Sequence, residues 1–290
     1  MADFFQFLFS GLTVGAVYAL VALGFTLIYN ASDVVNFAQG EFVMLGGMIA
    51  AFAVAAGVPL AAAGALAIVL TVLVGLLLHR LAIEPARGAS TVTLIIITIG
   101  ASLVLRGIAA IVFDKQSHGL PAFSGTTPVV VFGASVLPQA FWVMGGTVLV
   151  LVALWAFLAR TLFGKAVLAT AANRIAAQLV GVNTKRVMAF SFGASAGIGA
   201  LAGLLITPIT LTSYDVGTAL ALKGFAAAVL GGMGHPAGAV VGGLTIGLLE
   251  AFGAGYVSSA YKDAIAFIAL IAVLIVLPGG LFGVRSVDRV

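Results

Sequence analysis

The sequence predicts an all-α, polytopic membrane protein, a helix bundle of about eight or nine spans with some broken or re-entrant helices and a cytoplasmic helical segment. Of the 290 residues, 62% are apolar and only 8% are charged, whereas a soluble domain carries about 25% charged residues. Apolar runs recur at close to the 20 or so residues that cross a bilayer. The basic residues mostly stand between these runs, as membrane topology requires.

The apolar runs define nine candidate segments. They cover residues 7–29, 38–57, 60–79, 91–113, 139–159, 187–208, 217–233, 236–254 and 262–283. No Pro- or Ser-rich linker and no short solenoid repeat divides the chain, so residues 1–290 are expected to form a single transmembrane domain. The first segment has no basic residue before it and no clear cleavage site, so we expect it to stay as a membrane helix.

Loop charges orient these segments. The loops around 79–87 and 160–187 and the C-terminus carry the basic residues, which places them in the cytoplasm. Residues 114–138 hold one Lys among Gly, Pro and short β-prone runs and are expected to form an external loop. The N-terminus is then outside by parity. The short 217–233 segment is compatible with a re-entrant loop, but eight spans would put Arg285 and Arg289 outside, so nine is the better count.

The segment from Leu162 to Val187 is the one long charged stretch. Together with Arg160 it holds five of the 13 Lys and Arg residues. It is Ala-rich and predicted to be helical, with Gly164 before the helix, Gly181 near its end, and an apolar stripe formed by Ile175, Leu179 and Val180. Such a helix either lies flat on the membrane or docks against another protein. Its small alanines favour docking, because they would anchor poorly in lipid.

Polar residues inside apolar runs are candidates for function, because burying them in a membrane is costly. Asn36, Gln39 and Glu41 stand in a break between two runs. They line a path if the break lies at depth, or form a plain surface loop if it does not. Arg106, Lys223 and Glu250 lie near segment ends, where long side chains can also reach the interface.

Glycine patterns support two compatible interpretations. Residues 36–52 and 230–252 both place polar or helix-breaking residues before a Gly-rich run, as interrupted helices of transporters do. Several glycines also stand four apart, which allows close helix packing. These pairs are Gly193 and Gly197, Gly199 and Gly203, Gly238 and Gly242, and Gly243 and Gly247.

The sequence argues against an enzyme. It has no Cys, which excludes disulfides, thiolate metal sites and cysteine nucleophiles. Its three His residues fall in different loops, its carboxylates are scattered, and no metal-binding H-E-x-x-H is present. Gly164 and Lys165 do not belong to a phosphate-binding loop, because no Gly precedes them at the required spacing and Ala166 follows. No catalytic residue, metal site or bound cofactor is therefore expected in this chain.

Three blocks together resemble the inner-membrane permease subunits of the branched-chain amino acid (LIV-type) ABC importers. They are GAVYALVALGFTLIYNASDVVNFAQGE from Gly15 to Glu41, the segment from Gly164 to Val187 with its GVNT at Gly181 to Thr184, and LKGFAAAVLGGMGHPAGAVVGG from Leu222 to Gly243. The resemblance covers nearly the whole chain, and the combination is specific. Gln39 stands where many members have His, and His235 where Ser is common, so the identity of the substrate is left open.

The resemblance implies a subunit that provides the path while ATP and Mg²⁺ are bound by partners. Those partners would be a second permease, two cytoplasmic ATPases and a periplasmic binding protein, all at the bacterial inner membrane. The solute would be a branched-chain or other small amino acid, an amide or urea. The implied path residues are Asn36, Gln39, Glu41, Gly231, Gly232, Gly234 and His235; the implied ATPase-contacting residues are Gly164, Lys165, Ala171, Ala172, Asn173, Arg174, Gly181 and Asn183.

Two alternatives remain open from the residues themselves. A stand-alone secondary transporter or channel also uses interrupted helices, although no relay of ionisable residues across the spans is apparent. A purely structural subunit would assemble a complex without forming a path.

Overall fold

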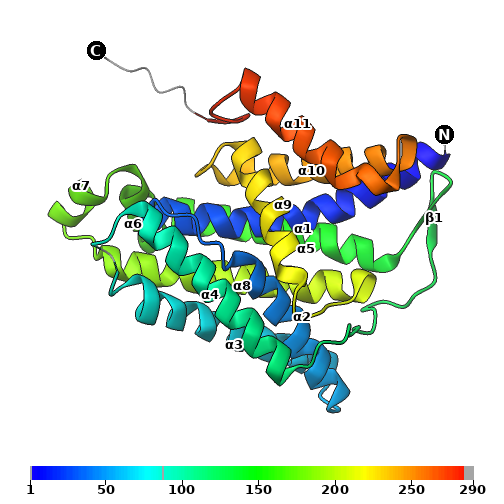
Figure 1. Cartoon of the computed structure of the whole chain (residues 1–290), viewed down its shortest axis with the longest axis horizontal. Helices are drawn as coiled ribbons and strands as arrows, with labels where there is room; N and C mark the ends of the chain where they lie inside the picture. The colour runs from blue at the N-terminus through cyan, green and yellow to red at the C-terminus, as the bar shows by residue number, and fades with distance from the viewer. Residues whose placement is uncertain (1, 87, 284–290) are drawn as a thin grey trace.

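A computed structural model describes residues 2–86 and 88–283, and it is a helical bundle with one small hairpin (Figure 1). In chain order the elements are α1 (Ala2–Ser32), α2 (Gln39–Ala55), α3 (Leu60–Leu78), the π-helical turn η1 (His79–Ile83), α4 (Thr91–Val112), β1 (Val129–Val131), β2 (Ala134–Val136), α5 (Pro138–Arg160), α6 (Leu162–Ala172), α7 (Arg174–Leu179), α8 (Thr184–Thr210), α9 (Val216–Gly231), α10 (Pro236–Tyr256), the 3₁₀ turn η2 (Ser259–Tyr261) and α11 (Lys262–Val276).

Each of the nine predicted segments contains one helix, and the all-α prediction is confirmed. Within the described residues, six helices are long and apolar enough to cross a membrane. These are α1, α3 continued through η1, α4, α5, α8 and α10. Helices α2 and α9 have only 17 and 16 residues. Helix α2 follows the first predicted break, and α9 precedes the second. The count of eight or nine crossings stays a prediction.

Helix α1 lies at the centre of the bundle, against α8, α9 and α10. Every residue from Val17 to Ile28 is buried, which requires neighbours on all sides of this helix, as is typical of a helix that is apolar all round. The predicted close packing at spaced glycines is confirmed. A Cβ on Gly243 would lie 2.4 Å from the Ala19 nitrogen, and one on Gly247 would lie 2.3 Å from the Gly15 Cα. By contrast, α3, α4 and α5 are mostly exposed and apolar.

One end of the bundle, the hairpin end, brings together the start of α1, the β hairpin and the α8–α9 connection. Ser135 in β2 donates its backbone N–H to the side chain of Gln6 at 2.8 Å, and His118 pairs with Thr212. The strands β1 and β2 are antiparallel, and their turn residue Gly133 has φ +83°, as tight hairpin turns favour. The predicted β-prone runs of the 114–138 loop therefore form strands.

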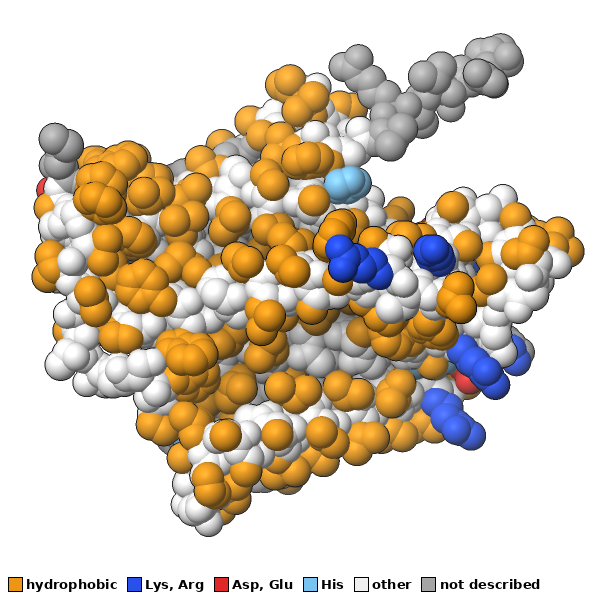
Figure 2. Space-filling model, turned by 180° about the vertical axis from the view of Figure 1, so that it is seen from behind, with side chains coloured by type: hydrophobic (Ala, Val, Ile, Leu, Met, Phe, Trp, Pro, Cys, Tyr) orange, Lys and Arg blue, Asp and Glu red, His pale blue; other side chains and the backbone are white. Residues whose placement is uncertain are grey.

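The opposite end, the basic end, carries η1, α6, α7 and the α9–α10 turn. Lys185 lies 3.9 Å from the carboxylate of Glu84, and the Phe282 N–H donates to the carbonyl of Gly231 at 3.1 Å. Figure 2 shows the Lys and Arg side chains of one face gathered toward the half of the molecule that holds α6 and α7 in Figure 1. The rest of that face is largely apolar, which fits a lipid-facing surface.

The predicted helix over 162–187 differs in detail. It consists of two helices, because Asn173 adopts an extended conformation and caps α7 with its side chain. Gly164 lies inside α6 rather than before it, where a Cβ would come 2.2 Å from the Phe157 carbonyl oxygen. Gly181, with φ +88°, follows α7 as predicted. The stripe of Ile175, Leu179 and Val180 is 72–84% exposed.

Candidate substrate path

The break between α1 and α2, residues 33–38, turns back into the bundle. Asn36 and Gln39 are 0% exposed and Glu41 is 1% exposed, so the interpretation of this segment as a plain surface loop is wrong. The Phe37 N–H donates to Thr98 Oγ1 of α4 at 3.2 Å, which anchors the break against a neighbouring helix. The three predicted path residues therefore lie inside the protein.

Gln39 joins three helices at the start of α2. Its side-chain nitrogen donates to the carbonyl of Ser195 in α8 at 3.2 Å, and the Ser195 hydroxyl lies 2.5 Å from Gln39 Oε1 and 2.9 Å from the carbonyl of Gly24 in α1. Gly24 has no room for a side chain, since a Cβ there would meet the Gln39 amide at 2.0 Å. This amide fixes the starting position of α2.

Two buried polar atoms in this region have no hydrogen-bond partner among the described residues. They are Asn36 Nδ2 and Glu41 Oε2. The other carboxyl oxygen of Glu41, Oε1, accepts a hydrogen bond from Ser102 of α4 at 2.8 Å. An unsatisfied buried polar atom costs about 1–3 kcal/mol of stability. Such atoms are therefore candidates for contact with a bound molecule or ion.

The starts of α2 and α9 meet in direct backbone contact. A Cβ on Gly40 would lie 1.9 Å from the carbonyl oxygen of Gly217, and one on Gly217 would lie 2.7 Å from the carbonyl oxygen of Gly40. The first turn of each helix therefore packs against the backbone of the other. The partial positive charges of two helix N-termini are thus brought to one place.

The other predicted path residues lie elsewhere, in the α9–α10 turn at the basic end. Gly232 and Gly234 have φ values of +97° and +93°, which favour glycine. The Gly234 carbonyl accepts a hydrogen bond from Asn30 at 2.8 Å, and His235 caps α10 through Gly238 at 3.1 Å. The start of α2 thus packs against the start of α9, whereas the start of α10, which the glycine pattern likened to it, lies beside the end of α1.

The eight residues predicted to contact an ATPase all lie on or beside α6 and α7. Lys165, Ala171, Ala172 and Asn173 are exposed, Arg174 is half-buried, and Gly164 is buried against α5. Asn183 caps α8 by accepting from the Arg186 N–H at 3.1 Å. The segment is therefore exposed at the basic end, and its contact with a partner stays a prediction.

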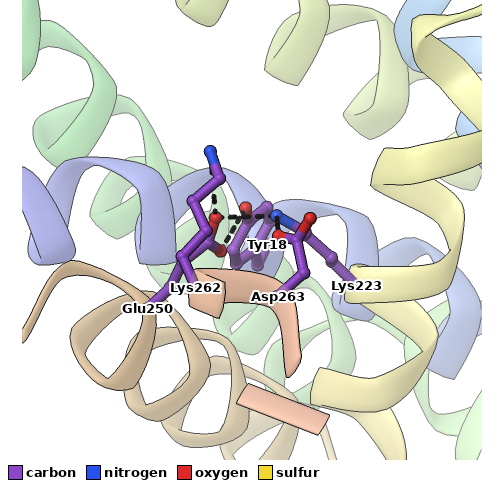
Figure 3. Close-up of polar contacts among 5 residues, drawn as sticks. All are labelled: Tyr18, Lys223, Glu250, Lys262 and Asp263. Carbon is purple, nitrogen blue, oxygen red and sulfur yellow. Dashed lines mark hydrogen bonds and ion pairs between the residues drawn. The ribbon is translucent and has the colours of Figure 1, made fainter. Parts of the chain in front are cut away.

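A cluster of ionisable side chains between α1, α9, α10 and α11 was not predicted (Figure 3). Lys223 of α9 lies 2.7 Å from both Glu250 of α10 and Asp263 of α11. Tyr18 of α1 donates to the other oxygen of Glu250 at 2.8 Å, and Lys262 lies 3.7 Å from Glu250. Lys223 and Glu250 thus do not extend to the interface as single charges; they pair with each other.

Comparison with known proteins agrees with this architecture. Residues 7–274 match the family model described as the permease component of branched-chain amino acid transport systems. The chain is 35% identical to LivH, the high-affinity branched-chain amino acid transport system permease protein of Escherichia coli, covering 99% of this chain and 98% of that protein. The chain belongs to this permease family.

Other relatives include a second branched-chain amino acid permease and a ribose import permease. BraD, a high-affinity branched-chain amino acid transport system permease protein of Pseudomonas aeruginosa, is 34% identical over 99% of this chain and 98% of its own. The ribose import permease protein RbsC of Haemophilus influenzae is 29% identical over 89% of this chain and 81% of its own. Among solved structures, a chain of PsaBC from Streptococcus pneumoniae in complex with Fab matches with a TM-score of 0.50 at 12% identity, covering 93% of this chain and 90% of that one. This last likeness concerns the fold alone. Membership of the family and the six long apolar helices make the chain a multi-pass membrane permease.

Proposed function

We propose that this permease is the membrane subunit of an ABC importer that moves branched-chain or other small amino acids, or related amides or urea, into the cytoplasm. ATP would be hydrolysed by separate subunits. The observation that carries the proposal is the exposed α6–α7 segment at the basic end of a chain of this family. Its apolar side chains, 72–84% exposed at Ile175, Leu179 and Val180, suit a protein partner.

In this proposal the α6–α7 segment is the lever that the ATPases move. Two short helices hinged at Asn173 form a compact unit, and α6 contacts α5, α1 and α8. A displacement of α6 would therefore reach the helices that hold the start of α2. The partner set would be two cytoplasmic ATPases that bind ATP and Mg²⁺, a second related permease and a periplasmic binding protein, at the bacterial inner membrane.

Nine crossings are part of the proposal. The contacts at the two ends support them, because each successive connection lies at the opposite end from the one before. The 113–137 loop and the α8–α9 connection share the hairpin end, while η1 and the start of α8 share the basic end. By the charge rule the basic end is cytoplasmic, and the N-terminus is outside.

We further propose that the solute passes beside the starts of α2 and α9. Two helix N-termini meet there, and they favour an anionic group such as the carboxylate of an amino acid. Glu41 Oε2, which has no hydrogen-bond partner among the described residues, lies 2.7 Å from the Cβ position of Gly217 at the start of α9. Asn36 Nδ2, just before α2, also has no partner among those residues. Gly231, Gly232, Gly234 and His235 would then act at the cytoplasmic mouth of the path, rather than at the same depth as Asn36.

One observation favours the alternative of a stand-alone secondary transporter. The Tyr18, Lys223 and Glu250 cluster places ionisable groups inside the bundle, and transporters that couple to protons use such groups. The energy source separates the two functions. An ABC importer requires ATP and the ATPases, whereas a secondary transporter requires an ion gradient.

The test is affinity purification of the tagged chain in mild detergent, followed by reconstitution of the purified complex into vesicles. We expect ATPases and a second permease to co-purify, and leucine uptake to require ATP. Ala172→Asp should abolish uptake or release the ATPases, because Ala172 is exposed at the end of α6. Lys115→Asp in the opposite loop is the control. Recovery of the chain alone, with uptake driven by a proton gradient, would contradict the proposal.

A further inference from the structure

A hollow of about 150 Å³ opens between α4 and α9, next to the meeting point of α2 and α9. Phe37, Ser102, Leu103, Arg106, Thr218 and Leu222 contribute to its lining. The walls are mostly apolar, with a few polar groups on one side.

The polar side contains a guanidinium group with spare donors. Arg106 donates to Thr218 Oγ1 at 3.0 Å, and this is the one hydrogen bond that the described residues provide for it. A guanidinium group has five N–H donors in a planar fork, and that fork matches a carboxylate. Burying an arginine in a membrane-spanning helix costs free energy, so such residues usually pair with another group or serve a function.

Groups of the opposite character lie beside it. Ser102 donates its hydroxyl proton to Glu41 Oε1 at 2.8 Å, so its own oxygen keeps lone pairs that can accept from an ammonium group. The Glu41 carboxyl group lies behind Ser102, and its Oε2 is buried without a hydrogen-bond partner among the described residues. The start of α9, at Gly217, adds the partial positive charge of a helix N-terminus.

We propose that this hollow binds a zwitterionic aliphatic amino acid. Arg106 and the start of α9 would receive the carboxylate, Ser102 backed by Glu41 would receive the ammonium group, and Phe37, Leu103 and Leu222 would contact the side chain. The inference rests on the proposed function in one respect: the open side of the hollow has to be covered by the second permease subunit, since a site facing lipid would hold an acyl chain.

A second hollow lined by a cationic side chain is a weaker candidate. Lys223 lines a cavity between α1, α8 and α9, but its ammonium group already contacts the two carboxylates of Glu250 and Asp263 at 2.7 Å. A substrate carboxylate would have to displace one of them. Arg106 donates to a neutral hydroxyl, and the Glu41 carboxyl group within its electrostatic range is hydrogen-bonded to Ser102 instead.

The test uses the absence of cysteine from the chain. A single Leu222→Cys, at a position that is 50% exposed beside the hollow, is labelled with a maleimide in the purified complex. At leucine concentrations ten times the dissociation constant we expect labelling to slow about tenfold, because only about one site in eleven is then free. Leucinamide and isocaproate, which each lack one charged group, should protect less. Leu149→Cys on α5, 68% exposed, is the control and should show no protection.

Arg106→Gln in the Leu222→Cys background should remove the protection, and Arg106→Lys should retain part of it. Labelling that leucine does not slow, or equal protection with Arg106→Gln, would overturn the proposal. If the partner subunit blocks the cysteine, the leucine-dependent rise in Tm of the complex decides: a rise that Arg106→Gln leaves unchanged, or no rise, overturns it too. Uptake measured in parallel separates the two proposals, since ATP-driven uptake without protection rejects the hollow alone, and protection without ATP-driven uptake rejects the importer alone.

Discussion

Gly40 is the position at which a single methyl group should do most damage. A Cβ there would come 1.9 Å from the Gly217 carbonyl oxygen, which belongs to backbone and cannot move without shifting α9. We expect Gly40→Ala to destabilise the protein by at least the roughly 1–3 kcal/mol of an overpacked core, seen as a lower Tm and a smaller monodisperse fraction in detergent. Gly107→Ala is the matched control, because no side chain or other helix among the described residues lies within 4 Å of its Cβ position, apart from its immediate chain neighbours. An unchanged Tm for Gly40→Ala would mean that α2 and α9 are not in contact.

Lys223 should matter for stability through the charges it leaves behind. Its side chain is 14% exposed and contacts two carboxylates at 2.7 Å. Removing one partner of a buried pair costs about 3–5 kcal/mol, so Lys223→Met should lower the Tm strongly. Adding Glu250→Gln should recover part of that loss, since it removes the main uncompensated charge. Lys115→Met in the exposed loop should change little, and equal Tm values for both single variants would argue against a buried cluster.

The sequence predicts which residues are unusual but not which of them meet. Asn36, Gln39 and Glu41 are identified by polarity within an apolar run, whereas their burial depends on α4 and α8, which come much later in the chain. The ion cluster was missed because Tyr18, Lys223, Glu250 and Asp263 belong to four different helices, and periodicity does not identify neighbours. The available clue was that opposite charges each interrupt an apolar run, which favours pairing over isolation.

At the scale of elements, the break between α6 and α7 depends on one side chain. Asn173 Oδ1 accepts from the Ala176 N–H at 2.9 Å, and α7 has only six residues, too few to be stable alone. Loss of an N-cap costs about 1 kcal/mol, so Asn173→Ala should speed hydrogen exchange around Ala176 to Leu179 about fivefold. Asn183→Ala, which removes the cap of α8, should affect only the first turn of that helix. Unchanged exchange in α7 would show that packing, rather than the cap, holds it.

The bounds of the long apolar helices were predicted well, whereas the break inside the 162–187 segment was not. The difference has a physical reason. The apolar runs at 139–159 and 91–113 correspond to α5 and α4 within one residue at each end, because a span ends where its apolar sequence ends. In the 162–187 segment no such contrast exists. The competition between the helix and the Asn173 side chain decides the structure there, and alanine content alone suggested one continuous helix.

At the scale of the whole molecule, the two ends differ in chemistry as well as in position. The hairpin end has strands, a short turn and fewer basic residues, while the basic end carries the exposed α6–α7 segment and the Lys185–Glu84 contact. A bundle with this asymmetry has one favoured orientation in the membrane. The charge pattern of the sequence predicts that the basic end is cytoplasmic, since orientation depends on loop composition rather than on packing.

The absence of native cysteine also permits a direct test of orientation and span count. Ser117→Cys and Val257→Cys lie at the hairpin end and Val180→Cys at the basic end, and all three positions are exposed. An impermeant maleimide added to intact spheroplasts should label the first two, and Val180→Cys only after permeabilisation. Leu281→Cys, after α11 and 40% exposed, distinguishes the counts. Nine crossings place it beside the cytoplasmic α9–α10 turn, where the Leu281 N–H donates to Leu230 at 2.8 Å, so it should also require permeabilisation. Labelling of Leu281→Cys in intact spheroplasts would support eight crossings, and protection of Val257→Cys in the same cells would identify the 217–233 segment as the one that does not cross.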